Sequence, residues 1–185
     1  MDPHLATNVF TDSFFITYLI VLVVLLIMSA FFSLSETAYT SSNLIKLENQ
    51  AKTSKTAKLA LKIANDYDRF LSTILIGNNL VNITASAMAT VLFVKFYGDN
   101  LGPTIATIVI TVLVLIFGEV TPKSIARERP EGFARFNAYP LFFFSIIFYP
   151  ISLLLKGIQH LSKLIFGSKN KKSKQLTEEE FSMLV

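Results

Sequence analysis

The sequence predicts an all-α integral membrane protein with three transmembrane helices and a kinked juxtamembrane belt helix. Of its 185 residues, 52% are hydrophobic, and the mean hydropathy is +0.53. This composition is too apolar for an ordinary soluble domain. The chain also has no Cys, which excludes disulfides and thiolate metal sites. Four runs lack Lys, Arg, Asp and Glu, and each approaches the roughly 20 residues that a spanning helix needs: residues 13–35, 70–94, 100–118 and 136–155.

The first apolar run leads into a polar segment, residues 43–69, which carries five lysines and Arg69. Apolar residues recur among these lysines, so the segment predicts a short amphipathic helical pair on the membrane surface. By the positive-inside rule this loop is cytoplasmic, which places the N-terminal residues 1–12 outside. Glu36 and Thr37 are expected at the membrane boundary, where they cap or solvate the end of the first helix.

The second run is expected to travel outward to a turn at residues 97–103, and the third to return inward. The third run then delivers four basic residues to the cytoplasm, so the three-helix domain covers residues 13–127, with its cytoplasmic helical loop at about 41–69. Sixteen of the seventeen basic residues become cytoplasmic in this topology, with Lys95 the exception. The second run also contains small residues suited to close helix packing or to a dimer contact: Ala85, Ser86, Ala87 and Ala89.

The fourth run is not expected to span the membrane. A full crossing would export the lysines that follow it, against the positive-inside rule. Pro140 and Pro150 also leave only residues 141–149 between them, which is too short for a crossing. We therefore expect a bent, aromatic-rich belt helix, residues 128–166, in the inner leaflet. A proline-kinked fourth span is the alternative.

Residues 167–185 are expected to form a basic cytoplasmic linker and the start of a helical region. Thr177 and Glu180 match a capping box, so a helix is predicted to begin there. A soluble cytoplasmic domain is expected to follow in the parent protein.

Glu119 lies at the inner end of the third run, where an ionised group costs roughly 2.5 to 3.5 kcal/mol and needs a partner. Pro122 has no N–H, so the carbonyl of Gly118 loses its helical donor. A carboxylate and a free peptide oxygen suit a small hard cation such as Mg²⁺ or Na⁺. Alternatively, a kink ends the helix at the interface, with Glu119 in water and Lys123 snorkelling. Lys123 is also a candidate ion-pair partner of Glu119.

Two pairs of oxygen-bearing side chains accompany Glu119. Ser29 and Ser33 are four residues apart on the first helix, and Asn78 and Asn82 are four apart on the second, so each pair lies along one helix face. Counted at about 1.5 Å per residue, all of them fall at a similar depth, where they could replace most of a cation's water shell. Alternatively, the serines bond their own helix or pack helices closely, and the asparagines bond between helices without an ion.

Three motifs occur in order over about residues 10–180: Ser29-x-x-x-Ser33 with Ser35-Glu36-Thr37-Ala38, then Gly77-Asn78-x-x-x-Asn82, then Gly118-Glu119-x-x-Pro122-Lys123. Together they resemble the transmembrane (DUF21-type) domain of the CNNM/CorC family of Mg²⁺ transporters. The resemblance implies a multi-pass homodimer in the inner or plasma membrane, with a nucleotide-binding CBS-pair module outside this sequence. It also implies export driven by Na⁺ entry and a dehydrated Mg²⁺ held by six groups: Ser29, Ser33, Asn78, Asn82, the Gly118 carbonyl and Glu119.

From the residues and the resemblance together we expect a Mg²⁺ transporter that works by alternating access and is not an enzyme. The alternative is a membrane sensor or regulatory subunit that binds Mg²⁺ at the same residues without moving it. An intramembrane hydrolase is disfavoured because Ser29 and Ser33 have no His or Lys base at their depth. The basic loops are expected to face anionic lipid rather than nucleic acid.

Overall fold

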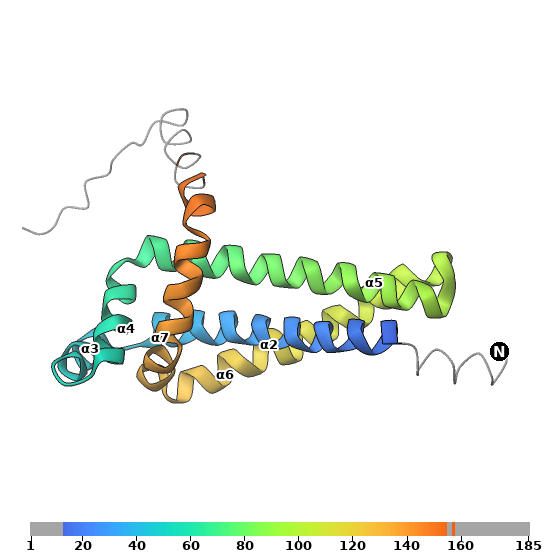
Figure 1. The fold of residues 1–185 in the computed structure, drawn as a ribbon. Helices are drawn as coiled ribbons and strands as arrows, with labels where there is room; N and C mark the ends of the chain where they lie inside the picture. The colour runs from blue at the N-terminus through green and yellow to red at the C-terminus, as the bar shows by residue number, and fades with distance from the viewer. Residues whose placement is uncertain (1–12, 155–156, 158–185) are drawn as a thin grey trace, which may run out of the picture. The chain divides into compact units, whose positions relative to one another are not determined.

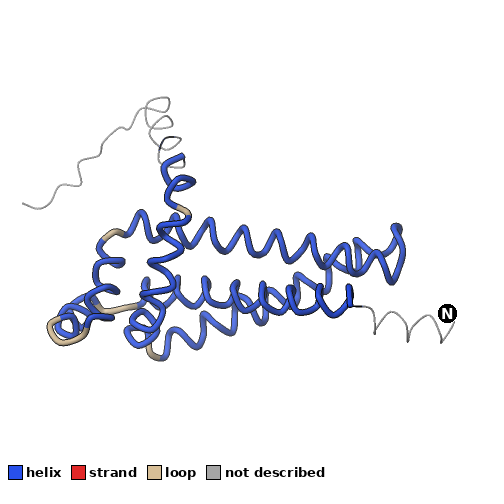
Figure 2. The backbone as a smooth tube through the Cα atoms, viewed as in Figure 1, coloured by secondary structure: helices blue, strands red, loops and turns tan. Residues whose placement is uncertain are grey.

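In the computed structural model, residues 13–154 and residue 157 are described, and every regular element among them is a helix (Figures 1 and 2). The chain divides into two units, residues 1–152 and 153–185, and the fold below is that of the first. The expected outer segment, the end of the belt and the linker with Thr177 and Glu180 lie outside the described residues. The elements are α2 (Ser13–Ser41), α3 (Leu44–Ala51), α4 (Lys55–Asn65), α5 (Tyr67–Leu113), η1 (Val114–Val120), α6 (Thr121–Glu128) and α7 (Pro130–Ile147).

Helix α2 has 29 residues, which gives a length of about 43 Å, more than the roughly 30 Å hydrocarbon core of a bilayer. It continues beyond the boundary expected at Glu36 and Thr37, and Thr37 is buried within it. The prediction that these residues cap or solvate a helix end is therefore wrong. The helix is prolonged because its last turns pack against α6 and α7, which replace the solvent.

The predicted reversal after the second apolar run occurs within α5, at Gly98 (Figure 1). Gly98 has a φ of 74°, in the left-handed region that glycine adopts without steric cost. The helix resumes at once and includes Pro103. We call residues 67–97 the first arm, residues 99–128 the second arm, and both together the hairpin.

Small residues let the two arms of the hairpin approach closely. A Cβ atom at Gly102 would lie 2.5 Å from the Cα of Val94, so only glycine fits this crossing. Further along, Ala85 and Ala89 of the first arm are buried with residues of the second arm, which assigns them to packing within the chain. Ser86 and Ala87 of the same predicted set are exposed.

Among the described residues, two helices are long and apolar enough to cross a membrane: α2, and the 62-residue stretch Tyr67–Glu128 that contains the hairpin's reversal. Only 11% and 22% of their most apolar windows are buried. A core helix of a soluble protein hides such a surface inside the protein. Here the apolar surface faces outward, where a bilayer can cover it.

The basic segment after α2 forms the predicted amphipathic pair, α3 and α4. The side chain of Asn43 accepts a hydrogen bond from the amide of Lys46, and Ser54 does the same for Ala57, so both helices begin at conventional N-caps. Leu47 and Ile63 are buried on the inner faces of the two helices. The lysines are left on the outer faces, where they stay solvated.

Helix α7 runs across the long helices (Figure 1). It passes through Pro140 and ends at Ile147, before Pro150, so the first proline does not bound a separate segment as predicted. Two buried contacts fasten it to α2. Asn137 donates from Nδ2 to Ser35 Oγ over 2.8 Å, and the Tyr39 hydroxyl donates to the carbonyl of Ala134 over 3.0 Å.

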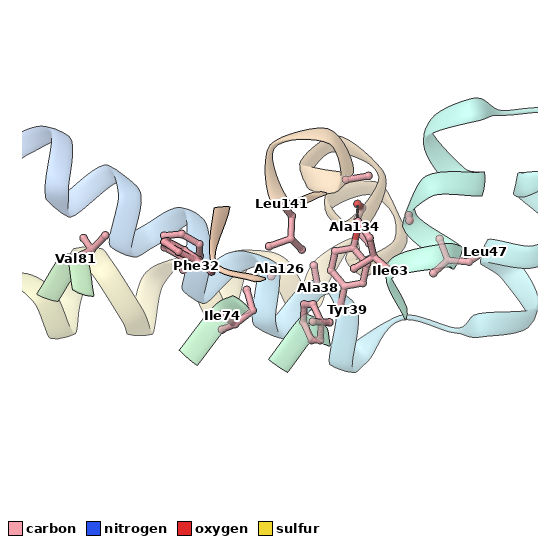
Figure 3. Packing of buried hydrophobic residues seen from close by; sticks show 14 residues of the cluster. Phe32, Ala38, Tyr39, Leu47, Ile63, Ile74, Val81, Ala126, Ala134 and Leu141 are labelled. Atoms are coloured by element: carbon pink, nitrogen blue, oxygen red, sulfur yellow. Dashed lines mark hydrogen bonds between the residues drawn. The ribbon is translucent and has the colours of Figure 1, made fainter. Parts of the chain in front are cut away.

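One hydrophobic core lies where α2, α4, the first arm and α7 meet (Figure 3). Phe32 is fully buried there, with its ring centroid 5.2 Å from that of Phe144. Tyr39 packs against Phe70 of the first arm with the two rings tilted and their centroids 4.9 Å apart. Aromatic pairs at these separations contribute about 0.5–1.5 kcal/mol beyond area burial. The core thus joins α7 to the same turns of α2 that carry polar residues.

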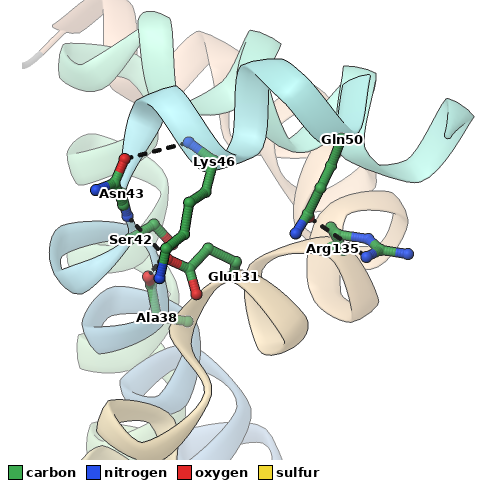
Figure 4. A network of polar contacts seen from close by, with 7 residues as sticks. All are labelled: Ala38, Ser42, Asn43, Lys46, Gln50, Glu131 and Arg135. Atoms are coloured by element: carbon green, nitrogen blue, oxygen red, sulfur yellow. Dashed lines mark hydrogen bonds and ion pairs between the residues drawn. The ribbon is translucent and has the colours of Figure 1, made fainter. Parts of the chain in front are cut away.

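A polar network joins α3 to α7 at the basic end of the fold (Figure 4). Glu131 accepts from the amide of Asn43 at 3.3 Å and pairs with Lys46 at 3.6 Å. Arg135 donates to Gln50 at 3.3 Å. Burial alone would raise the pKa of Glu131, but the backbone hydrogen bonds from its own amide and Asn43 and the charge of Lys46 together lower it.

Because the pKa of Glu131 is lowered on folding, its contribution to stability should be present above the unfolded pKa of about 4.3 and lost as the pH falls through the folded pKa. We expect Glu131→Gln to destabilise the protein at pH 7 by less than about 1 kcal/mol, since Lys46 is exposed. The difference from wild type should shrink as the pH falls below the unfolded pKa and vanish below the lowered folded pKa. Thermal unfolding in one detergent across this pH range measures it. Glu128→Gln, exposed on α6, is the matched control; an equal pH-dependent loss there would contradict the assignment.

Candidate functional site

Two glycines bring α2 against both arms of the hairpin. A Cβ atom at Gly77 would lie 2.4 Å from the ring of Phe32, so the ring fills the space that a side chain would need. A Cβ atom at Gly118 would lie 2.7 Å from the Oγ atom of Ser29. Since neither glycine has a side chain, short polar groups of the three segments can reach one another.

The polar contacts at this crossing join the predicted ligands in two pairs. Ser29 Oγ donates to Asn78 Oδ1 at 3.4 Å, and Asn82 Nδ2 donates to Glu119 Oε1 at 3.5 Å. Both distances exceed the usual 2.7–3.2 Å of such bonds, so both contacts are weak. A cation could therefore replace them at little cost.

Two oxygens at the site are buried and have no hydrogen-bond partner: Ser33 Oγ and Asn82 Oδ1. Ser33 lies one turn beyond Ser29 on the same helix face and is fully buried. Leaving a buried polar group unsatisfied costs about 1–3 kcal/mol. Asn82 also contacts the carboxylate of Glu119, and an oxygen-coordinated cation would satisfy such unpaired acceptors.

The hydrogen bonds of these serines and asparagines distinguish between their alternative roles. Ser29 bonds across to Asn78, and Ser33 has no partner, so neither serine makes the bond to its own helix that Ser35 makes to Phe31 at 2.7 Å. The two asparagines do bond between helices, as in their ion-free alternative. Asn82 nevertheless keeps one buried oxygen unpaired.

Gly118 and Glu119 lie in η1, one wide π-helical stretch that precedes α6. The amide of Thr121 donates to the carbonyl of Ile116, five residues back. Pro122 cannot donate to the carbonyl of Gly118, as predicted from its missing N–H. The regular α-helical hydrogen-bond pattern is therefore interrupted at the turn that carries Glu119. Such π-helical turns are frequent at functional sites. The helix does not end here, which removes the alternative of a terminal kink.

Lys123 forms its ion pair with Glu36 of α2, at 3.0 Å, rather than with Glu119. Both side chains are about one-third exposed. The expected Lys123–Glu119 pair is thus replaced, because α6 continues past Pro122 and presents Lys123 to the neighbouring helix. Sequence reasoning missed this contact; the available signal was the position of Glu36 one turn after Ser33.

The composition of the site restricts which cation fits it. Among residues 13–154, no group of three or more His, Cys, Asp or Glu residues could hold a metal ion. The site instead offers one carboxylate with neutral hydroxyl, amide and peptide oxygens. Hard cations such as Mg²⁺, Ca²⁺ or Na⁺ take such ligands, whereas zinc and copper favour nitrogen and sulfur.

Because Ser29 lies against Gly118, substitutions at these two positions should affect stability in a non-additive way. Gly118→Ala should destabilise the protein by about 1–3 kcal/mol, because the new methyl group overlaps Ser29. Adding Ser29→Gly removes the overlapping atoms, so the double variant should be less destabilised than the sum of the two single variants. A double-mutant cycle of thermal unfolding in detergent measures this coupling. Simple additivity would show that the two residues do not touch.

Comparison with known proteins identifies a family for this chain. Residues 20–185 match the family model described as Cyclin M transmembrane N-terminal domain (CNNM). The chain is 40% identical over 160 residues to the UPF0053 inner membrane protein YfjD of Escherichia coli strain K12, covering 85% of this chain and 37% of that protein. A UPF0053 protein of Haemophilus influenzae is 39% identical over 165 residues, covering 89% of this chain and 39% of the relative.

A more distant relative is a DUF21 domain-containing protein of Arabidopsis thaliana, described as chloroplastic. It is 34% identical over 166 residues, which cover 90% of this chain and 25% of that protein. The chain thus spans about two-fifths or less of the length of these three relatives. Its match to the family model and its identity to these proteins show that the chain belongs to the CNNM transmembrane domain family of membrane proteins.

Proposed function

We propose that this chain is the ion-translocating domain of a Mg²⁺ transporter that exports Mg²⁺ by alternating access, coupled to Na⁺ entry. The observation that carries the proposal is a pair of buried, unpartnered oxygens, Ser33 Oγ and Asn82 Oδ1, the second of them on the side chain that contacts the carboxylate of Glu119. Membership of the CNNM family supports a membrane role. The identity of the ion, its direction and its coupling rest on the resemblance of the three motifs.

The ligand set that we propose is Glu119 for charge and five neutral oxygens: Ser29, Ser33, Asn78, Asn82 and the Gly118 carbonyl. One carboxylate among neutral ligands binds a divalent cation only moderately, as its release requires. Mg²⁺ gives up its water reluctantly, so several protein oxygens are needed to replace it. Pro122 keeps the Gly118 carbonyl available. Glu36 and Lys123 neutralise each other in their ion pair. Glu119 is then the residue that supplies the negative charge for selecting the cation.

The membrane topology that we propose has three spans, α2 and the two arms of the hairpin. Most of the described basic residues lie on four helices, α3, α4, α6 and α7. These helices are at the end of the hairpin away from Gly98 (Figure 1). By the positive-inside rule this end faces the cytoplasm, with the N-terminus outside and the C-terminus inside. Helix α7 runs across the spans there and serves as the juxtamembrane belt.

The working assembly that we propose is a homodimer in the inner or plasma membrane, with a nucleotide-binding CBS-pair module elsewhere in the parent protein. Ser86 and Ala87 are exposed on the first arm, and small residues of this kind allow helices of two subunits to pack closely. We assign no enzymatic activity to the domain.

A second candidate function is a membrane sensor that binds Mg²⁺ at the same residues and passes the signal to a partner. The contacts of Ser35 with Asn137 and of Tyr39 with Ala134 favour it, because they connect the helix bearing Ser33 to α7. The two functions share their ligands and differ only in whether the ion crosses the membrane.

Ser33 provides a test of the site that separates binding from folding. Ser33→Ala should leave the stability of the Mg²⁺-free protein unchanged or raise it, because the buried hydroxyl has no partner to lose. It should weaken Mg²⁺ binding by roughly tenfold, since one oxygen ligand is removed. Ser35→Ala is the matched control, and it should destabilise the protein by about 1–3 kcal/mol while Mg²⁺ affinity is retained. Isothermal titration and thermal unfolding measure both quantities; unchanged Mg²⁺ affinity in Ser33→Ala would remove Ser33 from the site.

Transport itself is tested by Mg²⁺ flux from proteoliposomes with and without an opposing Na⁺ gradient. Wild-type flux should follow the gradient, and Glu119→Gln should abolish it because the variant lacks the charge that attracts the cation. Asn82→Ala should lower flux, whereas Asn79→Ala, an exposed neighbour that bonds its own helix at Leu75, should not. Glu119-dependent Mg²⁺ binding without any wild-type flux would favour the sensor.

A further inference from the structure

A small hollow lies outside the cation site, where α4, the start of α5 and α7 meet. Its volume is about 50 Å³, and Ile63, Phe70, Leu141 and Phe142 line much of it. A single water needs a volume of roughly 10–15 Å³, so the hollow has room for a group the size of a phosphate. Its polar lining comes from Lys62, Asp66, Arg69, Thr73 and Ser145.

Two cations of the hollow are held by aromatic rings of the α7 region. Lys62 Nζ lies 5.6 Å from the centre of the Phe142 ring, and the guanidinium of Arg69 lies 5.2 Å from that of Tyr149. Arg69 donates from NH2 to the carbonyl of Ser145 at 3.2 Å, while its Nε atom is buried without a partner. The hollow therefore presents the exposed ammonium group of Lys62 to a ligand, beside a guanidinium whose Nε atom is buried and unpaired.

The charges favour a monovalent anion. Lys62 and Arg69 contribute two positive charges and Asp66 one negative charge, so the lining carries a net charge of about +1 at neutral pH. A phosphodiester carries a single negative charge and balances it. Inorganic phosphate is partly doubly charged at pH 7, and its second charge would meet repulsion from Asp66.

The surroundings favour a lipid as the source of this phosphodiester. Phe143 and Ile146 of α7 are 60% and 52% exposed, and Leu71 of α5 is also exposed. Acyl chains would cover these apolar side chains while the headgroup enters the hollow. Lys55 and Lys58 extend the positive surface of α4 from Lys62, and each such lysine attracts anionic lipid.

We propose that this hollow binds the phosphodiester headgroup of an anionic phospholipid, with Lys62 and Arg69 as its ligands and α7 as the platform for its acyl chains. The site would fasten α4 and α7 to the inner leaflet. It rests on the membrane placement proposed above but not on Mg²⁺ transport.

Native mass spectrometry of the full 185-residue chain in detergent tests the proposal. The probes are palmitoyl-oleoyl phosphatidylglycerol, palmitoyl-oleoyl phosphatidylcholine and inorganic phosphate. Wild type should hold one phosphatidylglycerol per chain more tightly than either other probe. Lys62→Gln should weaken that binding about fivefold and Lys62→Glu about 25-fold, since each unit of charge near the lipid contributes similarly. Lys62 is exposed, so both variants should fold.

Lys52→Gln is the matched control, because it removes one charge from the same basic loop outside the hollow, and it should leave the affinity unchanged. Equal losses in Lys52→Gln and Lys62→Gln would overturn the site in favour of diffuse attraction. Equal binding of phosphatidylcholine, or tighter binding of inorganic phosphate, would overturn the phosphodiester assignment. Mg²⁺ binding should survive in Lys62→Glu, and lipid binding in Glu119→Gln, so failure of this proposal is distinguishable from failure of the cation site.

Discussion

The close approach of α2 to the two arms of the hairpin is the constraint on which the rest of the structure depends. Gly77 accepts the ring of Phe32, and Gly118 accepts the side chain of Ser29. Serine and asparagine side chains are short, so they meet across helices only if the backbones come this close. Larger residues at either glycine would separate the helices and leave the same polar groups buried without any partner, at a cost of about 1–3 kcal/mol each.

Close packing also explains why the polar groups are only partly satisfied. The bonds of Ser29 to Asn78 and of Asn82 to Glu119 are long, and Ser33 Oγ has none. A purely structural polar network would be expected to satisfy all its members, because an unpaired buried group is costly. A cation-binding site gains from the opposite arrangement, since acceptors that are weakly engaged in the protein remain available to the ion.

Helix α7 couples this site to the basic end of the fold. Ser35 and Tyr39 follow Ser33 on α2, and their buried bonds to α7 stabilise the turns that carry the serine pair. The network of Glu131 then joins α7 to α3. Movement of α7 would therefore be transmitted to the helix that carries Ser29 and Ser33 through a few short contacts.

The helical class, the amphipathic pair α3 and α4, the reversal near Gly98 and the family could all be predicted from sequence, because hydropathy, charge and glycine act locally. The candidate ligands were also predicted from sequence, since a spacing of four residues places side chains on one face of a helix. The structure decided what depends on neighbouring helices: that α2 continues through Glu36, that Lys123 pairs with Glu36, and that α7 passes through Pro140. Packing between distant segments sets these outcomes, and no local pattern records which segments will meet.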